Sequence, residues 1–113
     1  MAYDPGLAEQ LEDIVDRYYG HYERLENTRM FGGFGYLLNG NMCFGMHKDI
    51  LIVRIGVDQY EAIKDDPAVG PMDLTGRIMK GWAMIQPDGL AEPEEMKRFC
   101  DMAISFVLTL PPK

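Results

Sequence analysis

The segment from Phe34 to Met46 constrains the fold more than any other part of this sequence. It contains two short apolar runs, "FGYLL" and "MCFGM", on either side of "NGN". An Asn-Gly pair between apolar runs favours a two-residue turn in which both residues take positive φ, and such a turn joins antiparallel strands. We therefore predict a β-hairpin centred on Asn39-Gly40.

Strand signals continue beyond this hairpin. The turn residues "HKD" separate "MCFGM" from "ILIVRI", which predicts a second hairpin and a meander of three or four strands over residues 29–55. In the last strand one face carries Leu51, Val53 and Ile55, and the other carries Ile50, Ile52 and Arg54. The first face is typical of a core. The second is apolar but contains a charge, so we expect it to be partly exposed or covered by a partner.

Helical spacing marks both ends of the chain and one short segment between them. Asp4-Pro5 is a helix start, and Pro93 opens a second long helix that should stop at Pro111-Pro112. The short segment "VDQYEAIKDD" predicts a helix that Pro67 ends. The apolar stripes of the two long helices are Leu7, Leu11, Ile14, Val15, Tyr18 and Tyr22, and then Met96, Phe99, Cys100, Ala103, Ile104 and Val107.

Between the short helix and the last one, we predict a further pair of strands over residues 72–74 and 82–85, with a turn at Thr75-Gly76. The resulting order is α–β–β–β–β–α–β–β–α. It predicts a two-layer α+β domain in which an antiparallel sheet packs against the N- and C-terminal helices. The length of 113 residues fits a single domain over residues 1–113.

The apolar runs and the charge of the chain indicate its cellular compartment and the classes of partner that it can bind. No apolar run approaches the ~20 residues that span a bilayer, and the N-terminus lacks the features of a signal peptide, so we expect a cytoplasmic protein. The net charge is −7, with the excess acid in residues 1–27 and 83–113. A nucleic-acid binder needs a basic stripe to neutralise phosphates. The charge pattern therefore argues against direct nucleic-acid binding.

We find no pattern of a metal, nucleotide or catalytic site. Cys43 and His47 are four residues apart, which on a strand separates them by ~13 Å, too far to share a metal. Gly33 and Gly35 begin a dinucleotide-like pattern, but Leu38 stands where the third glycine belongs and a strand follows. We predict no metal, no cofactor and no catalytic residue. Cys43 and Cys100 are expected to be buried, reduced thiols.

The motifs together resemble a known family. "MFGGFGYLLNGNM" (30–42), "LIVRIG" (51–56) and "PMDLTGRIMKGW" (71–82) are similar to signature segments of the TfoX N-terminal domain family, which is named for the competence regulator TfoX, also called Sxy. The opening "MAYDPGLAEQL" and the ending Leu110-Pro111 fit as well. The resemblance implies a sheet covered by helices and a stand-alone N-terminal-type domain. It implies no enzymatic activity.

These observations favour a small regulatory or protein-interaction module that is not an enzyme. We place its interaction surface on the sheet face that carries Arg54, and include Trp82, Phe34, Tyr36, Arg77 and Lys80, since Trp and Arg are common interface anchors. A homodimer that buries this face is an extension of the hypothesis. Alternatively Trp82 is core and Arg54 pairs with Asp73. A second alternative is a small-anion pocket or enzyme site built from Arg54, Asp73, Arg77 and Lys80.

Overall fold

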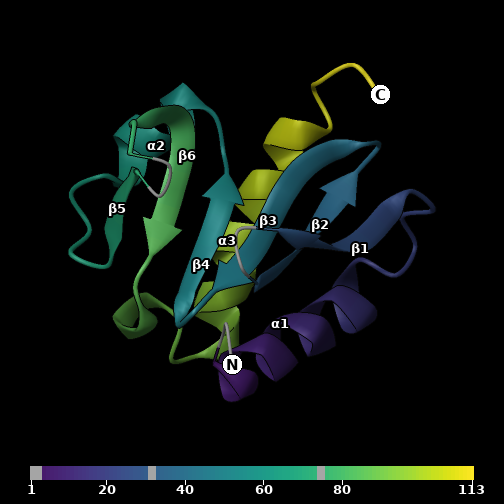
Figure 1. Ribbon diagram of the computed structural model, residues 1–113, viewed down its shortest axis with the longest axis horizontal. Coiled ribbons are helices and arrows are strands. Elements are labelled where there is room, and N and C mark those ends of the chain that lie inside the picture. Colours follow the sequence, from purple (N-terminus) through teal and green to yellow (C-terminus); the bar gives the residue numbers. More distant parts are fainter. Residues whose placement is uncertain (1–3, 31–32, 74–75) are drawn as a thin grey trace.

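A computed structural model describes residues 4–30, 33–73 and 76–113 of the chain. Within these residues it contains an antiparallel sheet and helices in the predicted order, with a short 3₁₀ turn, η1 (Pro87–Gly89), before the last helix (Figure 1). The α+β prediction is confirmed. The helices are α1 (Pro5–Tyr18), α2 (Val57–Ile63) and α3 (Pro93–Val107).

The sheet has six strands, and each neighbouring pair is antiparallel. Its spatial order is β1-β2-β3-β4-β6-β5, so the four-strand meander occupies one side and the β5–β6 hairpin the other. The strands are β1 (Leu25–Met30), β2 (Gly33–Leu38), β3 (Asn41–His47), β4 (Ile50–Arg54), β5 (Val69–Met72) and β6 (Met79–Ile85).

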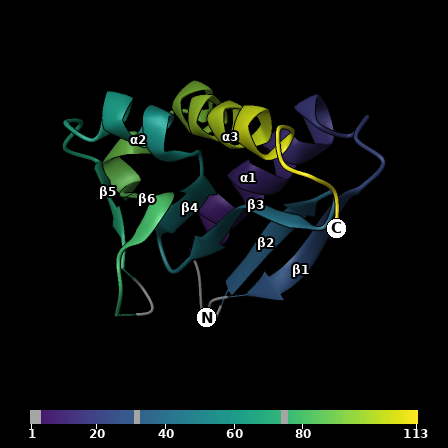
Figure 2. The ribbon, with the colours of Figure 1, turned by 90° about the horizontal axis from the view of Figure 1, so that it is seen from above.

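The helices lie in one layer on a single face of the sheet (Figure 2). The predicted stripe of α3 is confirmed, because all six of its residues are buried. They pack against the predicted core face of β4, where Leu51, Val53 and Ile55 are also fully buried. Gln59 of α2 donates from Nε2 to the carbonyls of Ile55 (2.7 Å) and Met102 (2.9 Å), which ties the short helix to both layers.

The predicted hairpin is present, and its glycines are required by the turn and by the close approach of neighbouring strands. Asn39 and Gly40 have φ of 55° and 83°, the left-handed values that this turn requires. At Gly45, a Cβ would lie 2.5 Å from the carbonyl oxygen of Phe34 and 2.8 Å from the Cα of Gly35. The backbone of β2 therefore approaches Gly45 too closely for any side chain at that position.

The first helix ends earlier than its apolar stripe predicts. It stops at Tyr18, and Tyr19 takes a non-helical conformation as the C-cap. Tyr19 therefore no longer follows the helical spacing. Its ring is buried in the core, and its hydroxyl donates to Asp101 of α3. Tyr18, which we expected in the buried stripe, is 46% exposed. The correction reflects a backbone break that residue spacing does not reveal.

The last helix also ends before the predicted Pro111-Pro112, at Val107. The residues after it return to the β2–β3 hairpin, where the Lys113 N–H donates to the carbonyl of Asn39 (2.8 Å). The buried Asn41 side chain donates to the carbonyl of Pro111 (3.0 Å). These bonds satisfy a buried amide and hold the end of the chain against the sheet.

The β5–β6 hairpin differs most from prediction. β5 begins at Val69 and contains Pro71, whereas we predicted a strand over residues 72–74. Leu74 and Thr75 lie outside the described residues. β6 begins three residues earlier than predicted, and its pairing is irregular: Pro71 lies opposite Ala83, but Met72 lies opposite Met79. Proline is tolerated there because β5 is an edge strand, so its missing N–H costs no interior bond.

Gly56 connects β4 to α2 and requires glycine for two reasons. Its φ of 85° and ψ of 156° fall in a region that is essentially restricted to glycine. A Cβ there would lie 2.5 Å from Cδ1 of Phe106 in α3. We predict that Gly56→Ala lowers the free energy of unfolding by at least about 2 kcal/mol, because backbone strain and overpacking add. Urea unfolding followed by circular dichroism measures this loss.

Gly76→Ala is the matched control. Gly76 also has a positive φ of 86°, but a Cβ there meets no atom within 4 Å. It should therefore lose only the strain contribution, about 1 kcal/mol. Equal losses in the two variants would show that the packing of Phe106 on Gly56 contributes nothing.

Candidate interaction surface

The sheet face opposite the helices carries an apolar cluster of its own. Ile52, Met72 and Met84 are buried in it, and Met42, Ile50, Met79 and Trp82 pack around them. The predicted alternation in β4 is therefore confirmed, with Ile50 and Ile52 on the face that the helices do not cover.

Arg54 lies beside Trp82 at the end of this face. The two residues are opposite one another in the β4–β6 register. The guanidinium carbon lies 5.4 Å from the centroid of the Trp82 ring and 6.0 Å from that of Phe106. These are cation–π distances, so the two rings hold the charge in place without neutralising it. Among the described residues no ion pair joins Arg54 to Asp73, which is exposed.

An apolar pocket of about 280 Å³ opens where β6 is irregular, and we call it the β6 pocket. Gly81 has a φ of 83°, and its carbonyl accepts from the N–H groups of both Ile55 and Gly56 at 2.9 Å. Pro71 of β5 pairs with Ala83 and Met72 pairs with Met79, so residues 80–82 of β6 form a bulge without partners in the β5 register, and the pocket lies at this bulge beside α2. The pocket is lined by Val57, Tyr60, Glu61, Pro71, Ile78, Met79, Lys80, Gly81 and Trp82.

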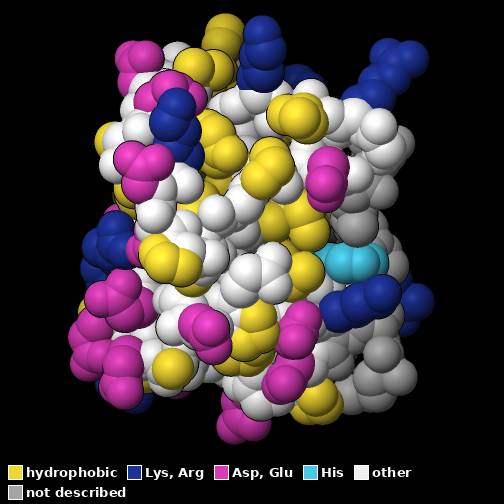
Figure 3. Space-filling view, turned by 90° about the vertical axis from the view of Figure 1, so that its left-hand side faces the viewer, with side chains coloured by type: hydrophobic (Ala, Val, Ile, Leu, Met, Phe, Trp, Pro, Cys, Tyr) yellow, Lys and Arg dark blue, Asp and Glu magenta, His cyan; other side chains and the backbone are white. Residues whose placement is uncertain are grey.

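The rim of the β6 pocket contains large apolar side chains in solvent. Ile78 is 69% exposed and Val57 is 53% exposed, the two highest values among the exposed large hydrophobic residues described. Figure 3 views the molecule from the side of β5 and α2, and hydrophobic side chains gather across the middle of that face. Single exposed apolar residues are ordinary, but a contiguous group around a cavity is typical of binding sites.

Basic residues at this surface are not neutralised by the fold. Neither Lys80, in the lining of the β6 pocket, nor Arg77 forms an ion pair with any described residue. Elsewhere among the described residues four other basic residues do form ion pairs, namely Arg17, Lys64, Lys97 and Arg98. Lys80 and Arg77 thus lack carboxylate partners in the described chain, although the net charge of the protein is −7.

The structure brings together only part of the predicted surface. Trp82 and Lys80 line the β6 pocket, with Arg54 beside Trp82. Phe34 and Tyr36 must be removed from the surface, because both are buried in the core beneath the helices. They sit on β2 with their side chains toward the helix layer, and Tyr36 packs on Phe44 at a centroid distance of 5.4 Å.

The small-anion alternative gains no support from this geometry. Of its four residues, Lys80 lines the β6 pocket and the other three do not. Arg77 and Asp73 are exposed, while Arg54 is held between aromatic rings.

Sequence reasoning also missed residues that the pocket requires. Val57 and Ile78 stood in segments read as a helix start and a loop. One signal in the sequence could have indicated the pocket. Ile78 is a large apolar residue in a segment predicted to be a loop, where no buried position was expected for it.

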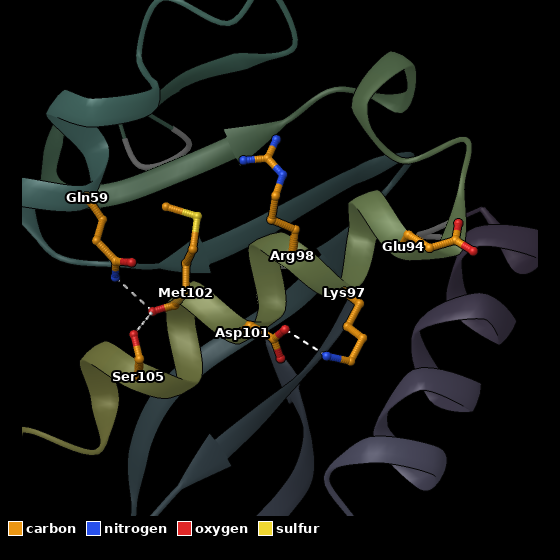
Figure 4. Close-up of a pocket in the computed structure, with 7 residues that line it drawn as sticks. All are labelled: Gln59, Glu94, Lys97, Arg98, Asp101, Met102 and Ser105. Atoms are coloured by element: carbon orange, nitrogen blue, oxygen red, sulfur yellow. Dashed lines mark hydrogen bonds and ion pairs between the residues drawn. The ribbon is translucent and has the colours of Figure 1, made fainter.

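A second groove, on the outer face of the helix layer, is a weaker candidate (Figure 4). Of its four charged lining residues, Lys97, Arg98 and Asp101 have partners within the fold, and Glu94 forms no ion pair with a described residue. Lys97 pairs with Asp101 at 2.8 Å, and Asp101 also accepts from the Tyr19 hydroxyl. Arg98 pairs with Glu95 at 3.3 Å. Most of the charge in the groove is therefore compensated within the fold, and Glu94 is the exception among the described lining residues.

The two cysteines are buried and free, as predicted. Burial raises the pKa of the Cys43 thiol, and the Arg54 guanidinium opposes this rise. Burial also raises the pKa of Cys100 well above its ordinary value, with Cys43 and Asp101 adding to the effect. Neither group therefore resembles a reactive thiolate. In the described parts of the chain no cluster of three or more metal-ligating residues is found, and no helix is long and apolar enough to cross a membrane.

Comparison with known proteins identifies one relationship. The family model described as "TfoX N-terminal domain" matches residues 17–107. No curated protein and no solved structure gives a significant match.

We predict that the protein loses stability at alkaline pH through its buried thiols. Their folded-state pKa values are raised, so they contribute stability at pH values below the unfolded thiol pKa of about 8.5. Above that pH the unfolded chain releases protons that the folded chain retains. Each thiol then lowers the free energy of unfolding by about 1 kcal/mol between pH 8.5 and 9.5, and the slope approaches about 1.4 kcal/mol per pH unit at higher pH. Urea unfolding between pH 8.5 and 9.5, in a non-thiol reductant, measures the slope.

Cys100→Ala serves as the control for this prediction. It removes one of the two titrating thiols, so the slope of the free energy of unfolding against pH should fall by about half. A variant that keeps both thiols should show the wild-type slope. A slope that Cys100→Ala leaves unchanged would contradict the assignment.

Proposed function

The chain belongs to the TfoX N-terminal domain family, and from this premise we propose that it is a non-catalytic regulatory module that acts by binding a protein partner. The proposed binding surface consists of the β6 pocket and the adjacent Arg54, Trp82, Arg77 and Lys80. Membership of the family supports a relation to the TfoX regulators. The choice of surface is supported by the side chains themselves.

A single observation carries the proposal. The exposed apolar residues Ile78 and Val57 border a pocket whose lining includes Trp82. Tryptophan beside arginine, with apolar contacts around it, is the composition of energetically dominant regions in protein interfaces. The other candidate, the groove on α3, is lined mostly by polar and charged groups that pair with one another.

We predict that Ile78→Ser abolishes partner capture without unfolding the protein. Ile78 is 69% exposed, so its removal should change the free energy of unfolding by no more than about 0.5 kcal/mol. The measurement is an affinity pull-down from the native cell, compared by quantitative mass spectrometry with the wild-type protein. We expect the specific partner to be lost from the Ile78→Ser sample.

Leu108→Ser is the matched control, because Leu108 is also an exposed aliphatic residue (47%) but lies at the C-terminal end of α3. It should retain the partner. Recovery of the same proteins by both variants would show that the β6 pocket is not the binding surface.

The same surface could be buried by a second copy of the chain, and we propose a weak homodimer as an extension. Sedimentation velocity at tens of micromolar should then show a wild-type dimer that Ile78→Ser converts to monomer and Leu108→Ser does not. A strictly monomeric wild-type protein at these concentrations would remove the dimer and leave the binding of another protein untouched.

A further inference from the structure

We propose that the β6 pocket receives one apolar side chain from an acidic segment of the partner protein. The proposal rests on the proposed function and adds the chemistry of the partner: an aliphatic or aromatic anchor, flanked by aspartate or glutamate. The anchor enters the pocket, and the flanking carboxylates meet Lys80 and Arg77.

The size and lining of the pocket fit an anchor side chain. Its volume of about 280 Å³ is at the lower limit for small-ligand sites and suits one or two large side chains. Six of its nine lining residues are apolar, and they come from α2, β5 and β6 and from Ile78, which precedes β6. Burying an apolar side chain among them removes apolar surface from water, which favours binding.

The positive charges around the pocket favour negatively charged residues on either side of the anchor in the partner segment. Lys80 lines the pocket and Arg77 is exposed three residues before it, and neither has a carboxylate partner in the described chain. Arg54 adds a third positive charge beside Trp82. Charge complementarity of this kind steers encounter and fixes the orientation of a bound segment.

Acidic groups are also present near the pocket and must be counted. Glu61 lines it, but its carboxylate is already paired with Lys64 at 2.8 Å. Asp58, on the first turn of α2, and Asp73, after β5, are exposed. Near the pocket, three cations (Arg54, Arg77 and Lys80) and two acids (Asp58 and Asp73) therefore lack ion-pair partners among the described residues. Of these five residues, only Lys80 lines the pocket.

The edge strand beside the pocket indicates how the segment binds. β5 would be the natural site for an added strand, but Pro71 lacks the N–H that an added strand would need there. The pairing of β5 with β6 is also irregular between Pro71 and Met72. Insertion of a side chain into the pocket is therefore favoured over extension of the sheet.

Two other classes of partner fit less well. A membrane surface would require the apolar residues to protrude, whereas here they surround a concavity. A nucleic acid would require a basic stripe that neutralises several phosphates, whereas only three cations without ion-pair partners, Arg54, Arg77 and Lys80, are described at this surface.

A phage-displayed library of random peptides, selected against the intact protein, tests the proposal. We expect the enriched peptides to be acidic, each with a single large apolar residue. A synthetic peptide of the enriched sequence should bind with an affinity that falls at least fivefold between 50 and 300 mM salt. Enrichment of basic or uncharged peptides, or no enrichment, would overturn the proposal, as would tighter binding to anionic vesicles or single-stranded DNA than to the peptide.

Charge reversal at the pocket gives the residue-level test. Lys80→Glu should weaken peptide binding at least tenfold. Lys48→Glu is the matched control, because Lys48 is an exposed lysine in the β3–β4 turn, at the other end of β4 from Arg54, and should change the affinity less than twofold. Equal effects of the two variants would show only general electrostatics and would overturn the assignment to the pocket.

The outcomes separate this proposal from the broader one. If Ile78→Ser loses its cellular partner but the selected peptides show no acidic bias, the interaction surface stands and the partner chemistry is wrong. If Ile78→Ser keeps its cellular partners, the proposed function itself fails, whatever the peptides show.

Discussion

The carbonyl of Gly81 is the point on which the geometry of the β6 pocket depends. It accepts from the N–H groups of Ile55 and Gly56, both at 2.9 Å, at the place where β4 ends and α2 begins. A residue with a Cβ would be strained at Gly81, where φ is 83°, and that Cβ would lie 3.3 Å from the Cα of Gly56. The two glycines let the backbones meet at the bulge of β6, and the pocket lies beside this bulge.

The same junction fixes the position of the charged and aromatic groups. Because β4 and β6 are paired up to it, Arg54 and Trp82 lie opposite each other in the register. In addition, α3 brings the centroid of the Phe106 ring to 6.0 Å from the guanidinium carbon. A cation held by two rings keeps its charge, since the rings attract it through their quadrupoles and do not supply a carboxylate. The fold thus places positive charge next to an apolar pocket and does not neutralise it.

Much of the fold followed from local sequence, because its signals are local. The Asn39-Gly40 turn, the alternation along β4 and the stripe of α3 each depend on residues close in the chain, and all three are confirmed. The errors occur where distant contacts decide: Tyr19 turns inward toward Asp101, and β5 tolerates Pro71 because it is an edge. The β6 pocket was out of reach for the same reason, since it forms from α2, β5 and β6 only once they pack together. Phe34 and Tyr36 were assigned to the wrong face of the sheet. The alternation of side chains along a strand separates the two faces but does not show which face the helices cover.

The two sheet faces are therefore unequal in a way that bears on function. One face is closed by α1 and α3 over an apolar core, and the stability of the domain comes from there. The other retains a small buried cluster, Ile52, Met72 and Met84, which is continuous with Trp82 and Met79 at the lining of the pocket. A segment bound in the pocket would extend this cluster outward. In the proposed interaction, binding would add apolar burial to the less covered face, on the opposite side of the sheet from the helix layer.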